Sequence, residues 1–180
     1  SVILGLVLPD VIVIGGGIAG CTTAFYLATD GVDVLLIERS DLNSAASGAN
    51  AGSLHAQIQP EPFAELGPDW ARQYARALPF YMASIALWRD AAAAVGEDLD
   101  VSLDGGLLVA ANDQEMRLIE AKAKIERGAG LEMQILDRSE LSGKASSVSD
   151  RMIGAAYCPI EGKVNPLVAA PAFAAAARRL

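Results

Sequence analysis

The sequence predicts an α/β fold, in which a parallel strand–helix–strand unit is joined to part of a mixed α+β region. Two patterns indicate this fold. Apolar runs at 11–14 (VIVI) and 32–38 (VDVLLIE) enclose an apolar helical pattern at 17–29, and elements of this kind in this order make a right-handed βαβ unit. Beyond residue 59, longer helical patterns alternate with separated strand-like runs, which is typical of an α+β arrangement.

The N-terminal elements have clear individual signals. The run at 11–14 is continuously apolar, as expected of a strand that is buried on both faces. The helix at 17–29 ends at Asp30 and Gly31, and the strand at 32–38 follows. The apolar stripe of this helix comprises Ile18, Cys21, Phe25 and Ala28.

The middle of the chain is expected to hold a loop and then a helical region. The segment at 39–62 is rich in Ser, Ala, Gly and Asn and has little periodicity, and loops of this length are usually functional or disordered. A helical region at 68–95, interrupted by Pro79, follows it. Its candidate core residues are Trp70, Tyr74, Leu78, Met82, Ile85 and Trp88.

Two helix starts in the last part of the chain have strong signals. Asn112 caps a helix at 112–128, and Glu115 completes a start that resembles a capping box. Asn165, followed by Pro166, caps the last helix. The strands expected in this part lie at 102–111, 132–137 and 151–159.

The composition excludes several classes of protein. Of the 180 residues, 52% are hydrophobic and 20% are charged, so the chain can bury a core. The formal net charge of −8, without a basic run, argues against binding to a nucleic-acid backbone. Cys21 and Cys158 have no metal-ligand spacing and fit a reducing compartment, where we expect neither a disulfide nor a metal site.

The two ends of the sequence predict that this chain is part of a longer protein. The opening run, SVILGLVLPD, lacks the basic region and cleavage site of a signal peptide. It is also shorter than the roughly 20 residues that span a bilayer. The chain has no initial Met and stops with its last helical pattern, so we expect it to be incomplete.

The turn after the first strand has glycines in the spacing G-x-G-x-x-G. Gly15 allows a tight turn, Gly17 lets a pyrophosphate approach the backbone, and Gly20 lets helix and strand pack closely. Glu38, at the end of the second strand, can accept hydrogen bonds from both ribose hydroxyls of an adenosine. These features predict a Rossmann-like dinucleotide-binding unit. A glycine-rich turn without a ligand, and Glu38 as a solvated charge, are the simpler alternatives.

The chain resembles the FAD-dependent oxidoreductases of the D-amino-acid oxidase superfamily, in particular D-amino-acid dehydrogenases, glycine/sarcosine oxidases and opine oxidases. The segments that carry the resemblance are VIVIGGGIAGCTTAFYLATDGVDVLLIER, SAASGANAGSLHAQ, DGGLLVAANDQEMRLIEAKA and GKVNPLVAAPAFAAAARRL. Many flavoproteins share the glycine motif, whereas SGANAGSLH is more specific. The resemblance implies the N-terminal part of a glutathione-reductase-type FAD-binding domain at 1–58, part of a substrate domain at 59–160, and a helix at 161–180 that returns to the first domain.

The resemblance also implies FAD as the cofactor and a role for each matching residue. The glycine turn holds the pyrophosphate, Glu38 binds the ribose, and the small residues after position 46 run along the pyrophosphate and ribityl chain towards the isoalloxazine. Arg39 can stack on an adenine or meet a phosphate. The implied FAD-binding residues are Gly15, Gly17, Ile18, Ala19, Gly20, Glu38, Arg39, Ser47, Gly48, Asn50, Ala51, Gly52, Ser53 and Leu54.

The implied activity is oxidation of the C–N bond of a D-amino acid, glycine, sarcosine or an opine, by hydride transfer to flavin N5. The resulting imine hydrolyses to a keto acid. The implied partners are the substrate, an electron acceptor such as oxygen or a quinone, and a partner subunit or a C-terminal half. The implied localisation is cytoplasmic, with a peripheral position at the inner membrane as an alternative. An NAD-dependent Rossmann dehydrogenase and a non-catalytic nucleotide-binding fragment are the other interpretations.

No residue is assigned as catalytic, because the family's substrate-anchoring residues come largely from its second half. His55, the only histidine, follows the flavin loop. It can tune the flavin or act as a base, but a hydrogen-bonding loop residue is favoured. Cys21 and Cys158 are expected to be packing residues without a covalent flavin link.

Overall fold

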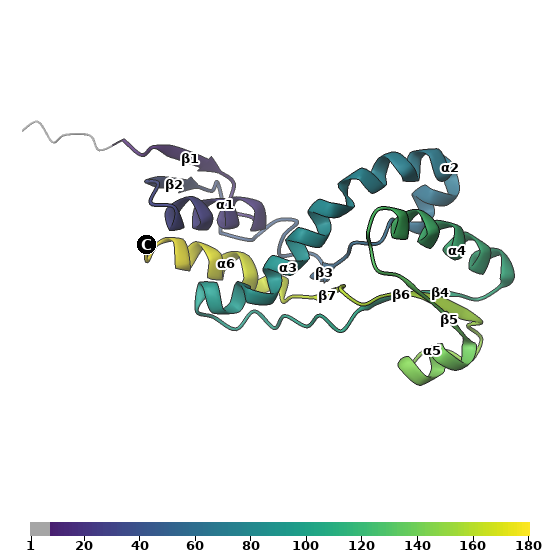
Figure 1. The fold of residues 1–180 in the computed structure, drawn as a ribbon. Coiled ribbons are helices and arrows are strands. Elements are labelled where there is room, and N and C mark those ends of the chain that lie inside the picture. The colour runs from purple at the N-terminus through teal and green to yellow at the C-terminus, as the bar shows by residue number, and fades with distance from the viewer. Residues whose placement is uncertain (1–7) are drawn as a thin grey trace, which may run out of the picture. The chain divides into compact units, whose positions relative to one another are not determined.

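The computed structural model describes residues 8–180 (Figure 1). The expectation that the opening run is neither a signal peptide nor a membrane span therefore falls mostly on residues 1–7, outside the described part. Among the residues described, none of the helices combines the length and the apolar character needed to cross a bilayer. The chain forms two compact units: unit 1 runs to residue 52 and includes 90–101 and 164–180, and unit 2 comprises 53–89 and 102–163.

Unit 1 contains the predicted strand–helix–strand unit. Its main elements are β1 (Val11–Ile14), α1 (Ile18–Thr29), β2 (Val34–Ile37) and α6 (Pro166–Ala177). The two strands pair in parallel, with Val11 opposite Val34 and Ile14 opposite Ile37. Helix α1 packs on the strands, and α6 packs on α1, where the rings of Phe25 and Phe173 meet edge to face at 5.4 Å. The α/β fold class is confirmed.

The expectation that the first two strands are buried on both faces is wrong for the described residues. Successive side chains point to opposite faces, and one set on each strand is exposed. Ile14 is 86% exposed and Leu35 is 46% exposed. The reason is that α1 covers only one face of the β1–β2 sheet, and no described element of unit 1 covers the other.

Unit 2 combines an antiparallel sheet with helices. Its elements are β3 (Ser53–Leu54), α2 (Pro60–Tyr74), the 3₁₀ turn η1 (Ala75–Ala77), α3 (Leu78–Val95, whose last turns belong to unit 1), β4 (Gly106–Ala110), α4 (Asp113–Gly128), β5 (Gln134–Asp137), α5 (Arg138–Lys144), β6 (Gly154–Cys158) and β7 (Gly162–Lys163). Strand β6 lies between β4 and β5, antiparallel to both. Strands β3 and β7 form a separate antiparallel pair.

The predicted helix signals of unit 2 are confirmed where they are local. The Asn112 side chain accepts hydrogen bonds from the N–H groups of Gln114 and Glu115 at the start of α4. Helix α2 begins earlier than expected, at Pro60, inside the predicted loop. Gly67, with a φ of +76°, kinks the helix before Pro68 and separates this first part from the part that was predicted. The break predicted at Pro79 corresponds to η1, which separates α2 from α3. The short helix α5 was not predicted, although Asp137 and Glu140 form a capping box.

The core of unit 2 lies between α2, the start of α3, α4 and the three-stranded sheet. Of the predicted core residues, Leu78 and Ile85 are buried, and Trp70, Tyr74 and Met82 pack against the cluster while partly exposed. The sixth, Trp88, is partly buried and is not among the residues of this core. Five of the six predicted residues therefore lie in or against the core.

We predict that Phe173→Ala destabilises the protein by about 3–5 kcal/mol, because Phe173 is 2% exposed and fills the space between α1 and α6. Leu167→Ala in the same helix is the control, since Leu167 is 66% exposed, and we expect a change within about 0.5 kcal/mol. Urea unfolding followed by circular dichroism measures both. Equal effects of the two substitutions would contradict the α1–α6 packing.

Candidate functional site

Strand β1 leads into α1 through a turn that requires glycine. Gly15 has a φ of +112°, and its N–H donates to the Ile37 carbonyl oxygen at 2.8 Å. A Cβ at Gly20 would lie 1.8 Å from the Gly15 carbonyl oxygen, a backbone atom that cannot move aside. This geometry agrees with the turn role expected of Gly15 and the close-packing role expected of Gly20.

The two middle glycines of the turn face side chains from later in the sequence. A Cβ at Gly17 would lie 2.8 Å from the Ser47 Oγ. A Cβ at Gly16 would lie 2.4 Å from the Leu42 Cδ2 and 3.0 Å from the Glu38 Cβ. Sequence reasoning did not assign a role to Gly16, although three glycines in a row were a visible signal.

Glu38 reaches back from the end of β2 to the glycine turn. Its Oε2 accepts a hydrogen bond from the Gly16 N–H at 2.6 Å, and its Oε1 accepts one from the Ser40 N–H at 2.9 Å. These hydrogen bonds, that from Gly16 above all, hold the pKa of the Glu38 carboxyl below its usual value. A carboxylate has about four lone-pair sites, so Glu38 keeps acceptor capacity for hydroxyl groups.

The loop after β2 completes the N-terminus of α1. Gly17, the N-cap residue, has no side chain, and the Ser47 Oγ accepts the hydrogen bond from the Ile18 N–H at 3.0 Å. The Asn50 side chain holds the loop itself, since its Nδ2 donates to the Ala46 and Ser47 carbonyl oxygens and its Oδ1 accepts from the Gly52 N–H. Sequence reasoning expected Asn50 to offer a donor to the cofactor, and that role remains a prediction.

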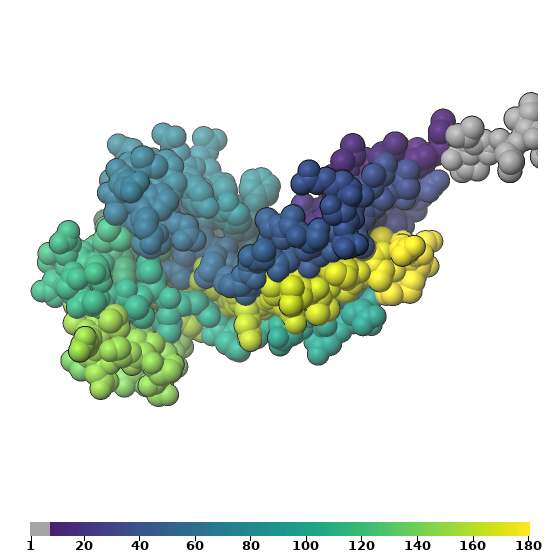
Figure 2. All heavy atoms as spheres, turned by 180° about the vertical axis from the view of Figure 1, so that it is seen from behind, coloured from purple at the N-terminus to yellow at the C-terminus, as the bar shows by residue number. Residues whose placement is uncertain are grey.

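Asn43 connects this loop to the glycine turn and to α6. Its N–H donates to the Gly16 carbonyl oxygen at 2.9 Å, and its Nδ2 donates to the Pro166 carbonyl oxygen at 2.8 Å. A Cβ at Gly48 would lie 2.2 Å from the Asn43 carbonyl oxygen, so the loop also needs a glycine there. Figure 2 shows the loop lying along α6. Sequence reasoning missed Asn43, because its partners are remote in sequence.

The other implied residues of unit 1 lie around these groups. Ile18 and Ala19 form the first turn of α1, and Arg39 and Ala51 are exposed. Gly52 has a φ of +71°, and a Cβ there would lie 1.9 Å from the Val164 carbonyl oxygen. The implied residues from 15 to 52 therefore belong to one unit, in which the loop 39–52 and the glycine turn are hydrogen-bonded to each other.

Ser53, Leu54 and His55 belong to unit 2. Ser53 and Leu54 form β3, opposite Lys163 and Gly162 of β7. The Nδ1 of His55 lies 3.7 Å from the Oε2 of Glu161, a side chain that is 1% exposed. His55 thus sits beside a buried carboxyl group directly after β3.

Three buried charged residues near this segment were missed by sequence reasoning: Lys122, Glu126 and Glu161. Lys122 and Glu126 form an ion pair within α4, with 2.7 Å between Nζ and Oε1. A signal for this pair existed, because the two lie on the same helical stripe as the buried Ile119 and Ala123. Charged residues on a buried stripe are rare unless they are paired.

Both cysteines are buried, as expected of packing residues, and their thiols are free in the structure. Burial, and to a lesser extent the Glu161 charge, raises the pKa of the Cys158 thiol to about 12. Burial also raises the pKa of the Cys21 thiol. Thiols held protonated are poor nucleophiles. Among residues 8–180, no group of three or more His, Cys, Asp or Glu side chains is arranged to hold a metal ion.

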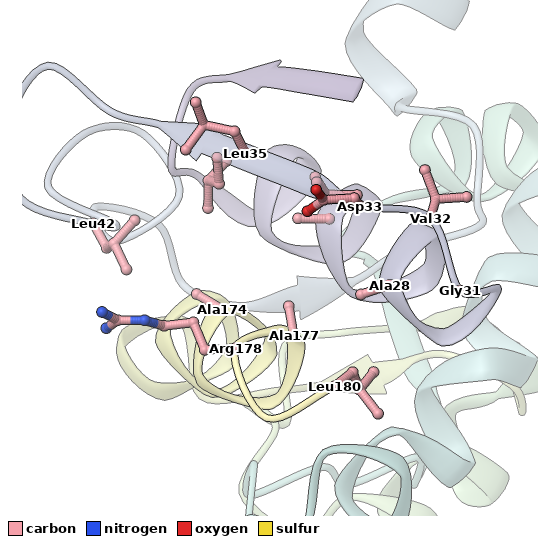
Figure 3. A pocket seen from close by; sticks show the side chains of 13 residues that line it. Ala28, Gly31, Val32, Asp33, Leu35, Leu42, Ala174, Ala177, Arg178 and Leu180 are labelled. Atoms are coloured by element: carbon pink, nitrogen blue, oxygen red, sulfur yellow. The ribbon is translucent and has the colours of Figure 1, made fainter. Parts of the chain in front are cut away.

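A separate pocket of about 620 Å³ lies in unit 1 between α1, β2 and α6 (Figure 3). It is lined by small and apolar side chains such as Ala28, Leu35 and Ala177, with Asp33 and Arg178 among its polar residues. None of the implied FAD-binding residues lines it. We therefore place the candidate site at the glycine turn and not in this pocket.

The comparisons with known proteins agree on one family. Residues 10–180 match the family described as FAD dependent oxidoreductase (DAO). An opine oxidase subunit of Agrobacterium tumefaciens is 29% identical over 88% of this chain and 42% of that protein. The gamma-glutamylputrescine oxidoreductase of Escherichia coli is 31% identical over 88% of this chain and 37% of that protein.

A solved structure agrees with this match. The crystal structure of glycine oxidase from Geobacillus kaustophilus superimposes with a TM-score of 0.72 at 28% identity, over 94% of this chain and 44% of that one. The chain therefore spans less than half the length of the relatives it matches. Because the family match extends over nearly the whole sequence, the chain belongs to the FAD dependent oxidoreductase (DAO) family.

Proposed function

We propose that this chain provides the part of an FAD-dependent oxidoreductase that binds the ADP half of the cofactor, and that the protein oxidises the C–N bond of an amino acid or amine. The observation that supports this most is the set of contacts at the N-terminus of α1. There Glu38 and Ser47 both meet the glycine turn, in a chain that belongs to an FAD-dependent family.

The residues at this turn fit the cofactor. No acidic side chain of α1 itself lies in its first turn. Glu38 occupies the Gly16 N–H, so a pyrophosphate would use the remaining N–H groups of the helix N-terminus and its dipole. The glycine at position 15 keeps the turn free of side-chain atoms, and no atom lies within 4 Å of where its Cβ would be. The free acceptor sites of Glu38 suit the two hydroxyl groups of the adenosine ribose.

Each part of the chain then has a defined task. The N-terminus of α1 binds the pyrophosphate through those backbone N–H groups that do not already donate to Ile37, Glu38 or Ser47. Glu38 holds the ribose, and the loop around Ser47, which Asn50 keeps in shape, lines the pyrophosphate and ribityl chain. The backbone of Ser53 and Leu54 approaches the isoalloxazine.

When bound, FAD supplies the hydride acceptor for amine oxidation. The named relatives include an opine oxidase subunit and a glycine oxidase, which support an opine or glycine as the substrate. A D-amino acid and sarcosine are the other substrates that the family resemblance implies. The substrate loses a hydride from the carbon that carries nitrogen, and the imine is hydrolysed to a keto acid. Because the opine oxidase relative is one subunit of its enzyme, it also supports a partner chain here, and oxygen or a quinone would accept the electrons.

We predict that Gly20→Ala abolishes retention of FAD, because the added Cβ would meet the Gly15 carbonyl oxygen and separate α1 from β1. Overpacking of this kind costs about 1–3 kcal/mol of stability. Gly143→Ala is the matched control, since a Cβ in α5 meets no atom within 4 Å. The measurement is flavin absorbance near about 450 nm after desalting. Flavin retained by Gly20→Ala, or absent from the unmodified protein supplied with FAD, would contradict the proposal.

We predict that Glu38→Gln weakens FAD binding about ten- to hundredfold, equivalent to about 1.5–3 kcal/mol for hydrogen bonds to a charged group. Glu65→Gln, an exposed site on α2, is the control. The affinities come from quenching of flavin fluorescence.

The same titration has an expected pH dependence. The Gly16 and Ser40 N–H groups, that of Gly16 above all, lower the pKa of the Glu38 carboxyl from its usual value, so the carboxylate is the form present near neutral pH. The affinity gap between the protein and Glu38→Gln should stay constant around neutral pH and close only as the pH falls through this lowered pKa. A gap that closes above pH 5 would contradict this role.

A further inference from the structure

A groove of about 760 Å³ lies in unit 2, between α4 and the stretch that runs from α2 through η1 to the start of α3. Figure 1 shows α2 and α4 side by side. Eleven residues line the groove, and all of them belong to unit 2. None is among the implied FAD-binding residues, so the proposed function leaves this groove without a role.

The groove exists because small residues stand where these helices face each other. On α4, the lining positions Ala121, Ile125 and Gly128 follow one helical stripe, at spacings of four and three residues. Gly128 has no side chain, and no atom lies within 4 Å of where its Cβ would be. From the other side, η1 contributes Ala75, which is 6% exposed. The space that larger side chains would fill is therefore open to an apolar group.

Three cationic side chains line the same groove: Arg72 and Arg76 from one side and Lys124 from the other. None of the described lining residues is acidic, in a chain with 22 acidic and 14 basic residues. Arg72 pairs with Asp69, and both are exposed. Within residues 8–180, Arg76 and Lys124 pair with no acidic side chain. The groove therefore presents two free cations beside an apolar floor.

The size of the groove favours a small molecule over a protein or a membrane surface. Pockets that bind small molecules have about 300–1,000 Å³, mostly apolar walls and a few polar groups. One side of a standard protein interface has about 20–30 residues, well above the eleven here. A membrane is bound by an apolar face that projects into the lipid, whereas the apolar Phe63 and Ala75 of this groove are each 6% exposed.

We propose that this groove binds an apolar monocarboxylate from solution. Its hydrocarbon tail lies over Ala75 and Ile125, where it removes apolar surface from water, and its carboxylate meets the Arg76 guanidinium and the Lys124 ammonium. A guanidinium can bind a carboxylate through two parallel N–H···O bonds, and such charge-assisted bonds are stronger than neutral ones. The inference goes beyond the proposed function and does not depend on flavin binding.

The test is equilibrium dialysis of the intact protein at neutral pH against radiolabelled octanoate, octanol and octylammonium, which share one hydrocarbon chain and differ in charge. We expect one saturable site for octanoate and at least about tenfold weaker binding of the other two, because the cations favour only the carboxylate. The absence of a saturable octanoate site, or equal affinity for octanol, overturns the inference.

Charge variants locate the site of the carboxylate. Arg76→Gln and Lys124→Gln should each weaken octanoate binding about three- to tenfold and leave octanol binding unchanged, since each removes one cation and little of the apolar floor. Arg138→Gln, which removes an exposed cation of α5, is the control and should change neither affinity. Octanoate affinity that is unchanged in both groove variants overturns the inference.

Filling the groove gives an independent test. Gly128→Phe places a ring in the open space at the end of α4 and should abolish the octanoate site. Gly143→Phe in α5, where an added Cβ also meets no atom within 4 Å, should keep it. Circular dichroism checks that both variants are folded, and a folded Gly128→Phe that still binds octanoate overturns the inference. Binding to phosphatidylglycerol vesicles that is lost in Arg76→Gln, in a protein without an octanoate site, overturns it too and assigns the groove to a membrane surface.

Discussion

The close approach of α1 to the end of β1 is the constraint on which the candidate site depends. Gly20 lies against the Gly15 carbonyl oxygen, where a Cβ would come within 1.8 Å. Only this approach lets the helix begin directly after the strand and expose its N-terminal amides at the turn. Because the helix start has no side-chain cap of its own, the rest of unit 1 is organised to complete it.

Residues from later in the sequence supply what the turn lacks. Glu38 and Ser47 bind the Gly16 and Ile18 N–H groups, and Asn43 ties the same region to α6. Side chains that satisfy a helix terminus from a distance make its shape depend on the whole unit. A ligand that replaced or shared these hydrogen bonds would therefore change the conformation of the loop 39–52 as well as that of the turn.

Local signals in the sequence predicted the elements that depend on local physics. The glycine spacing, the caps at Asn112 and Asn165, and the apolar runs at 11–14 and 32–38 all led to elements that the structure contains. Contacts between distant residues could not be read in this way, because a single sequence gives no sign that two positions meet. The prediction that both faces of the β1–β2 sheet are buried failed for a related reason. An apolar run shows that a strand can be buried, but it does not show which element covers it.

The same limit applies to the buried charges of unit 2. Lys122 and Glu126 show their pairing through helical spacing, but Glu161 meets residues 56 and 57 only through the fold. Polar groups of this kind are costly to bury unless every partner is in place. The free energy that their burial costs is spent on fixing residues 56–58. This segment follows the strand that is proposed to approach the flavin.

The most direct test of the central claim is an amide ¹H–¹⁵N NMR titration of the protein with ADP, which represents the adenylate half of the cofactor. We expect the largest shifts at Gly16, Gly17 and Ile18, with smaller shifts around Ser47, because these groups form the proposed pyrophosphate turn. Shifts confined to the pocket lined by Leu35 and Ala177, or no shifts at millimolar ADP, would contradict the account.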